Sequence, residues 1–282
     1  MKRALTALAV DLGARFVASL LLGMPLVAAV SASGIGHFQA GDRLLFEPGG
    51  LYLAETGRVL FASLVPLGNT ALVSALVLSV CLLLPHGALL AALADRDRDP
   101  FSAQLGRATA AFPALLSLSG LTLIAQGLVL VFFSGAAGAT RRAFGAATPP
   151  VSDGAALVTL GVGVLVALLL GVARDLCRAS AVVESSDGRS ALKSGLSTLK
   201  RHPVAIARGY LVPALAGLAL FGVATLATEW LDVSRPGAFG LPLVIAVHVT
   251  TAVGLALCRA RWLATAVVLV EAQPDASSIA RR

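Results

Sequence analysis

Three basic residues stand where they could bind an anion. His86, Arg174 and Arg261 each lie at or just past the end of an apolar segment. The acidic residues that follow them after 9, 10 and 10 positions are Asp95, Glu184 and Glu271. A ring of three basic side chains could face an anionic headgroup or solute. The alternative, which stays open, is that each one anchors its segment at the membrane interface by extending toward the headgroups.

The residue types needed for catalysis or metal binding occur without the spacing that such chemistry requires. The four histidines are dispersed, and neither a His-Glu-x-x-His pattern nor a Walker loop is present. Gly161-Val162-Gly163 lies inside an apolar segment rather than after a strand, so it is no nucleotide fingerprint. The three cysteines form no Cys-x-x-Cys pair and are interpreted as small packing residues. We therefore predict a chain that is not an enzyme, with no catalytic residue, cofactor or metal ligand.

A few polar groups interrupt the apolar segments or lie at their ends. Gln126 and His248 fall near the middle of two segments, and we interpret both as groups that hydrogen-bond between helices. His248 also stays a functional candidate, because an ionisable group within a membrane is costly. Asp175 and Arg178 have the spacing of an ion pair on one helix face, which we interpret as structural.

The elements that must position these residues are transmembrane helices. Hydrophobic residues make up 57% of the 282 and charged residues 13%, against roughly 45–50% and roughly 25% in soluble domains. A span needs about 20 residues, and such apolar segments fall at 16–32, 66–85, 111–136, 155–173, 209–228 and 241–258. They must be helices, because the bilayer offers backbone groups no partner. The predicted fold class is all-α: a polytopic membrane helix bundle of six spans with short amphipathic interfacial helices.

The distribution of Lys and Arg predicts the orientation. With the N-terminus in the cytoplasm, 17 of the 22 Lys and Arg residues lie on the cytoplasmic side, as the positive-inside rule requires. Both termini are therefore expected to be cytoplasmic. The first segment resembles a signal peptide, but Asp11 and Arg15 would make its polar leader unusually long, so we expect the helix to be retained.

An internal repeat is suggested by three acidic residues that are each followed three positions later by serine. Asp99, Asp187 and Asp275 are spaced 88 residues apart, and each follows an even-numbered span. Asp is a strong N-cap and Pro100 suits the first helical position, so each is predicted to begin a helix. The whole chain is then one membrane domain of three tandem hairpins, 1–98, 99–186 and 187–274. Chance spacing is the alternative.

The segment after Asp187 is predicted to be a basic amphipathic helix that ends before Pro203. Leu192, Leu196 and Leu199 lie on one stripe. Basic residues elsewhere on this helix are candidate contacts to anionic lipid, namely Lys193, Lys200 and Arg201. Such a helix either lies in the membrane interface or packs on its neighbours inside the protein, and the sequence favours neither.

Two sequence patterns resemble a known group of proteins. They are EPGGLYLAE, which begins at Glu47, and ARDLCRASAVVESSDGRSALKSGLSTLKRHP, which begins at Ala173. This pairing resembles uncharacterised bacterial six-helix proteins that are similar to the membrane domain fused to some glycerophosphodiester phosphodiesterases. The resemblance implies a six-helix fold in a bacterial inner membrane. It carries over no catalytic residue, because no phosphodiesterase domain is present.

Three function classes remain open from the sequence. The first is a non-catalytic scaffold, assembly or lipid-interacting protein, with anionic lipids and a protein as partners. The second is a transporter or permease subunit for an anionic solute or lipid, which would need a polar cavity. The third is an intramembrane lipid-modifying enzyme, which would need converging catalytic groups. Nucleic acid is not an expected partner, because no basic domain with interleaved aromatic residues occurs.

Overall fold

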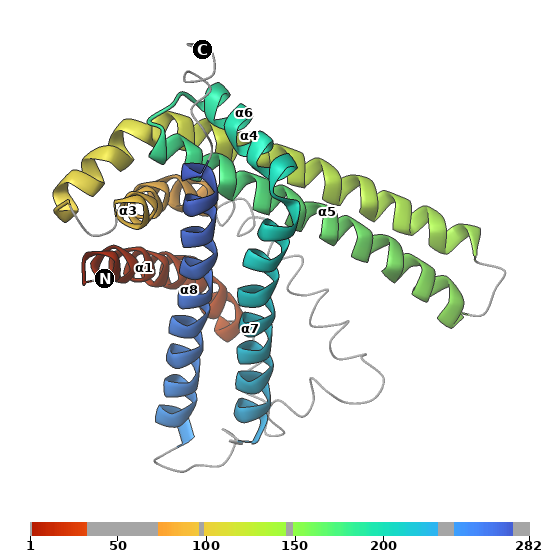
Figure 1. Ribbon diagram of the computed structural model, residues 1–282. Helices are drawn as coiled ribbons and strands as arrows, with labels where there is room; N and C mark the ends of the chain where they lie inside the picture. Colours follow the sequence, from red (N-terminus) through yellow and green to blue (C-terminus); the bar gives the residue numbers. More distant parts are fainter. Residues whose placement is uncertain (1, 33–72, 96–98, 145–148, 231–239, 273–282) are drawn as a thin grey trace. The chain divides into compact units, whose positions relative to one another are not determined.

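The described part of the chain is helical. The computed structural model describes residues 2–32, 73–95, 99–144, 149–230 and 240–272, and their regular elements are α-helices (Figure 1). The helices are α1 (Lys2–Ala32), α3 (Leu83–Ala94), α4 (Phe101–Ala143), α5 (Pro149–Val183), α6 (Gly188–Arg201), α7 (Pro203–Trp230) and α8 (Gly240–Glu271). Residues 73–81 are also helical and lead through a turn at Leu82 into α3.

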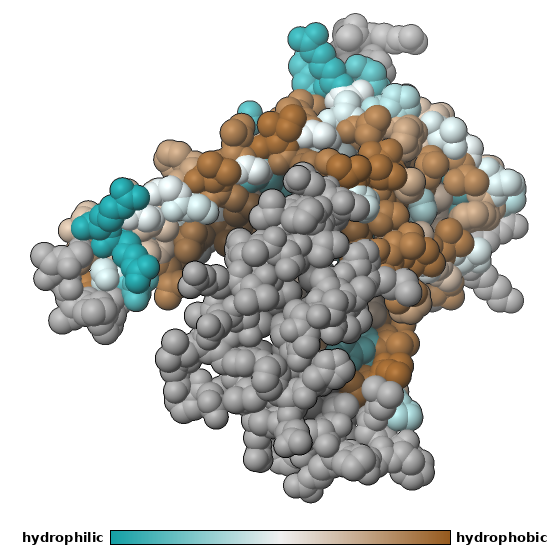
Figure 2. Space-filling model, turned by 180° about the vertical axis from the view of Figure 1, so that it is seen from behind, coloured by the Kyte–Doolittle hydropathy of each residue, from teal (hydrophilic) through white to brown (hydrophobic). Residues whose placement is uncertain are grey.

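Six helical segments are long and apolar enough to cross a membrane. They are Ala4–Gly23, Val73–Ala94, Phe101–Ala143, Val151–Val183, Pro203–Ala227 and Pro242–Glu271. Large apolar side chains on them are exposed, as for Val131 and Phe132 on α4, and apolar surface extends over the helices in Figure 2. A surface of this kind needs a lipid solvent. The predicted all-α polytopic helix bundle with six spans is confirmed. The three tandem hairpins and the 88-residue repeat stay predictions.

The chain divides into two compact units, which are described separately. Unit 1 comprises Met1–Ala7, His86–Ala216 and Leu257–Arg282. Unit 2 comprises Leu8–Pro85 and Gly217–Ala256. The candidate residues other than His248 fall in unit 1.

In unit 1, α4 and α5 form a long antiparallel hairpin (Figure 1). Ser119 on α4 accepts a hydrogen bond from Arg178 on α5. Seven residues further along α4, Gln126 Nε2 donates to the Ala167 carbonyl at 2.8 Å. After another seven residues Phe133 packs on Gly163, where an added Cβ would lie 2.5 Å from the Cβ of Phe133 and 2.7 Å from its ring carbon Cγ. Contacts that recur every seven residues are typical of helices packed side by side at a shallow angle.

The length of α5 matches the thickness of a bilayer. Near its N-terminal end Asp153 pairs with Arg141 of α4 at 2.9 Å. The next charged residue along α5 is Arg174. At about 1.5 Å per residue, the apolar stretch between them spans roughly 30 Å, the depth of the hydrocarbon core. The apolar part of α5 between Asp153 and Arg174 is therefore long enough to cross that layer.

The connection from α3 to α4 is held by two carboxylates that share one guanidinium. Arg107 of α4 donates to Asp95 at 3.1 Å and also contacts the Asp99 carboxylate. Asp95 accepts the Asp99 backbone N–H as well, at 2.6 Å. Partial burial raises the pKa of the Asp95 carboxyl, but the Asp99 N–H and the Arg107 guanidinium outweigh it and lower the pKa below 3.8 overall. This contribution to stability is therefore complete above about pH 4 and is lost as the pH falls through the lowered pKa.

The predicted N-cap at Asp99 is wrong. Pro100 holds the N-cap position of α4 with an extended backbone, and α4 begins at Phe101. The reason is that Arg107 engages the Asp99 side chain, whereas Asp95 fixes its backbone N–H. Asp187 does hold the N-cap position of α6, but its side chain makes no capping hydrogen bond. Asp275 lies outside the described residues.

Helix α6 docks on α5 through small residues. Its buried residues are Ala191, Gly195 and Thr198, and a Cβ added at Gly195 would lie 2.7 Å from the backbone N and Cα of Cys177. Only glycine permits this approach. Glu184 accepts a hydrogen bond from Ser194 at 2.8 Å beside the contact. The predicted helix before Pro203 is confirmed, although small residues rather than its leucine stripe form the contact.

Unit 2 contains an ion pair within a candidate span. Arg15 Nε donates to Asp11 at 2.7 Å, one helical turn apart on α1. Asp11 is 5% exposed. Pairing lets a carboxylate remain in a region of low dielectric. Elsewhere in this unit α7 and α8 pack closely, because Gly254 leaves room for Leu220.

The glycine contact predicts the effect of a single methyl group. Gly195→Ala should lower the free energy of unfolding by about 2 kcal/mol, because backbone atoms of Cys177 cannot rotate away from the new Cβ. It should also increase maleimide labelling of the buried Cys177 thiol, measured with Cys81 and Cys258 replaced by serine. Gly106→Ala is the matched control: its Cβ meets nothing within 4 Å, so it should stabilise by about 0.5–1 kcal/mol. Equal labelling of Cys177 in both variants would contradict the docking contact.

Candidate functional site

The side chain of Asp175 forms the centre of the candidate site in unit 1. Asp175 is 1% exposed. One carboxylate oxygen accepts a hydrogen bond from Arg259 at 2.8 Å, and the other accepts the indole N–H of Trp262 at 2.8 Å. These bonds join α5 to α8. A buried carboxylate requires such partners, because its hydration has been removed.

Two further arginines of α5 stand within about one helical turn of Asp175 along the chain. Arg174 Nε is 3.6 Å from the oxygen that Arg259 also contacts. That distance is an ion pair but is too long for a hydrogen bond. Arg178, one turn further along α5, donates to Ser119 Oγ of α4 at 2.6 Å. The buried acid therefore has two arginines at ion-pair distance and a third one turn along its helix, and we call Arg174, Asp175, Arg178 and Arg259 the charge centre.

Close packing of α7 on α8 positions Trp262. The Tyr210 ring of α7 meets the indole edge to face, with centroids 5.3 Å apart and planes at 85°. Next to Tyr210, Gly209 allows Thr265 of α8 to approach: an added Cβ would lie 2.6 Å from its Cγ2. Trp262 is 2% exposed. The indole is therefore held in one orientation, with its N–H toward Asp175.

The three basic residues predicted as a ring differ in their surroundings. His86 is buried in α3 at 2% exposure, next to Gly87, which packs on Leu115 and Ala108 of α4. Arg174 belongs to the charge centre and is 27% exposed at its side chain. Arg261 lies exposed on α8. The ring stays a prediction, and Arg174 is the member that contacts the buried acid.

The remaining candidates have separate roles. Lys193, Lys200 and Arg201 are exposed on α6. The Gln126 side chain hydrogen-bonds between helices, as predicted.

For His248 the prediction of a bond between helices is wrong. Its Nδ1 pairs with the Val244 carbonyl one turn earlier in α8, and the side chain is exposed. The carbonyl of its own helix is simply the nearest partner. Within the described residues, no cluster of His, Cys, Asp or Glu could hold a metal ion.

Sequence reasoning missed Arg259, Trp262 and Ser119 as partners of the charge centre. It singled out Asp175 and Arg178 only as an ion pair within one helix, and that pair stays a prediction. The available signal was weaker: Arg259, Arg261 and Trp262 gather at the end of one apolar segment, as Arg174, Asp175 and Arg178 do at the end of another.

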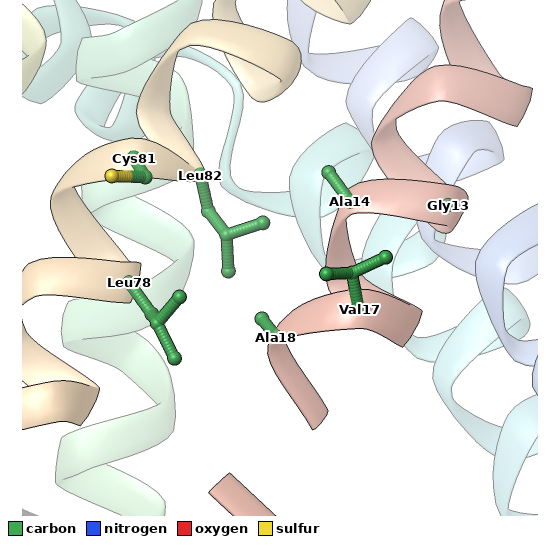
Figure 3. A pocket seen from close by; sticks show the side chains of 7 residues that line it. All are labelled: Gly13, Ala14, Val17, Ala18, Leu78, Cys81 and Leu82. Carbon is green, nitrogen blue, oxygen red and sulfur yellow. The ribbon is translucent and has the colours of Figure 1, made fainter. Parts of the chain in front are cut away.

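Unit 2 contains an apolar pocket between α1 and the segment that leads into α3. It has a volume of about 300 Å³. Figure 3 shows the side chains of Val17, Ala18, Leu78 and Leu82 around it, with the Cys81 thiol at its side. The lining carries no charge, so the pocket suits apolar chains and not an anionic solute.

The fold and the site define a helical multi-pass membrane protein with a buried charge centre in unit 1. Comparison of the chain with known protein families, curated proteins and solved structures finds no match. The resemblance drawn from the two sequence patterns therefore stays a prediction.

The charge centre predicts a large cost for removing the Asp175 charge. Asp175→Asn should lower the free energy of unfolding by about 2 kcal/mol, because the buried carboxylate's charge-assisted hydrogen bonds with Arg259 and Trp262 are replaced by those of a neutral amide. The fluorescence of Trp262, measured in a Trp230→Phe background, should shift to the blue, because the carboxylate charge beside the indole N–H is removed.

Asp153→Asn is the control for this change. It removes a carboxylate whose pair with Arg141 is exposed, with side-chain exposures of 50% and 67%, so it should cost less than about 1 kcal/mol. Equal costs for the two variants would show that the Asp175 interactions do not stabilise the fold.

Proposed function

We propose that this chain is a non-catalytic bacterial inner-membrane protein that binds the anionic lipid surface of the cytoplasmic leaflet through α6. The observation that carries the proposal is the way α6 is docked. Its small residues face α5, while its basic residues are exposed and Leu196 is 39% exposed. The sequence left two placements open for α6, packing on its neighbours and lying in the membrane interface. In this proposal each placement holds for a different face of the helix.

The faces of α6 follow one another around its axis. At about 100° per residue, the buried residues Ala191, Gly195 and Thr198 lie within one narrow sector. The leucine stripe of Leu192, Leu196 and Leu199 is centred roughly 100° away. Most of the basic residues lie further around the helix in the same direction, on the side opposite the buried residues. A helix docked in this way can insert leucines among acyl chains while its basic groups reach the headgroups beside them.

The basic charge of α6 favours an anionic surface. Its basic residues are Arg189, Lys193, Lys200 and Arg201, and the helix contains no acidic residue. Each contributes on the order of 1 kcal/mol near an anionic membrane. The excess of Lys and Arg on this side of the spans supports a cytoplasmic location, with both termini inside.

A spin-label experiment on the full chain in nanodiscs tests the proposal. Native cysteines are replaced by alanine, and a label is placed at Leu196 or, as a control, at the exposed Ser190, about 120° away around α6. With 30% phosphatidylglycerol in phosphatidylcholine, the label at 196 should be accessible to oxygen and shielded from a water-soluble nickel complex. The label at 190 should show the reverse.

A charge variant separates the electrostatic contribution. Lys193→Gln with Lys200→Gln should abolish the dependence of the depth at 196 on phosphatidylglycerol, while the label at 190 stays unchanged. If both labels are equally accessible to the nickel complex in anionic nanodiscs, α6 does not lie in the interface and the proposal is wrong.

A further inference from the structure

We infer that Arg174 and Arg259 form a specific site for a phosphate group, supplied by a phospholipid headgroup at the inner end of α5. The inference rests on the proposed lipid-binding function and deepens it, but it concerns other residues. Helix α6 offers diffuse attraction to a charged surface, whereas the charge centre offers two guanidinium groups at a defined point.

Arg174 and Arg259 each have more N–H donors than their contacts with Asp175 occupy. The same Asp175 oxygen lies 2.8 Å from a terminal nitrogen of Arg259 and 3.6 Å from Nε of Arg174. Arg174 Nε is buried and makes no hydrogen bond within the described part of the chain. Each guanidinium has five N–H donors. Most of these donors therefore remain for a ligand with several acceptor oxygens.

The charge balance also favours an anion. Asp175 contributes one negative charge, and the two arginines in ion-pair contact with it, Arg174 and Arg259, contribute two positive ones. Trp262 occupies the second carboxylate oxygen, so the acid has little capacity left to neutralise Arg174. A phosphate matches the planar donor fork of arginine and can accept from two such groups together.

Access to the site remains open on the side of the arginines. The side chains of Arg174 and Arg259 are 27% and 38% exposed, whereas Asp175 is 1% exposed. A ligand can therefore reach the guanidinium groups without displacing the buried acid. Asp175 thus holds the arginines from within the protein, while their exposed N–H groups are available to a ligand.

The two arginines also stand at the level where a headgroup is expected. Arg174 is the first charged residue after the apolar stretch 154–173 of α5, and Arg259 is the first after the uncharged or weakly basic stretch 240–258 of α8. Each arginine thus follows the apolar stretch of its own helix, where a headgroup is expected.

Native mass spectrometry of the full chain tests the site. The protein is purified in detergent and exposed to equal amounts of phosphatidylglycerol and phosphatidylcholine. The wild type should retain phosphatidylglycerol, and Arg174→Gln should reduce that retention about tenfold, as expected for one lost charge-assisted contact. This variant leaves the Asp175 bonds to Arg259 and Trp262 intact, so the protein should remain folded.

Arg261→Gln is the matched control. It removes the same charge from the same end of α8, at an exposed position for which no contact with Asp175 is present in the described residues. It should leave retention within twofold of the wild type. Equal losses from Arg174→Gln and Arg261→Gln would overturn the specific site in favour of general electrostatic attraction.

A second arm identifies the source of the phosphate. The thermal stability of the protein in phosphatidylcholine nanodiscs is measured with inorganic phosphate at 10 mM. Chloride at the same ionic strength is the control. No stabilisation, together with retained phosphatidylglycerol, supports a lipid headgroup. Stabilisation that Arg174→Gln abolishes would instead assign the site to the free anion and overturn the headgroup assignment. Neither retention nor stabilisation would overturn the site altogether.

Failure of this inference and failure of the proposed function are distinguishable. The depth of α6 is read from labels at positions 196 and 190, which do not report on the charge centre. If α6 lies in the interface and Arg174→Gln has no effect on retention, the proposed function survives and the specific site does not.

Discussion

A carboxylate that has lost its water must be neutralised by its neighbours, and in unit 1 this requirement falls on Asp175. Arg259 and Trp262 meet the two oxygens from α8. Trp262 can do so because Tyr210 and Gly209 allow α7 to pack closely beside it. On the same helix as the acid, Arg178 reaches Ser119 of α4. The buried charge therefore joins α5 to α8 directly and to α7 through Trp262, while Arg178 joins α5 to α4 one turn away.

Glycine and other small residues complete this arrangement. Gly195 brings α6 onto the backbone of Cys177, and Gly163 brings α5 onto Phe133. Such contacts matter most in a membrane, where apolar side chains gain little by leaving lipid and association depends on close packing. Because the small residues of α6 pack against α5, its leucines and basic residues are available to the bilayer. The proposed lipid contact is thus a consequence of how the helix packs.

Most of the helical architecture could be predicted from composition and apolar length. A stretch such as 155–173 must be helical in lipid whatever its partners are, and α5 covers it. The end of α6 could be predicted because Pro203 cannot continue that helix. The cap at Asp99 could not, because Arg107 competes for its carboxylate from two turns into the next helix. Local preference predicts a cap only when no distant group engages the side chain.

The sequence by itself determined the six apolar spans and the charge asymmetry, because these follow from the free energy of transferring each residue from water to lipid. Only the tertiary structure decided the partners of those residues. Asp175 is paired with residues more than 80 positions away, and Gln126 bonds across the hairpin, whereas His248 bonds within its own helix. These outcomes depend on which helix faces approach one another, and that approach is set by small residues whose effect appears only when two helices are packed together.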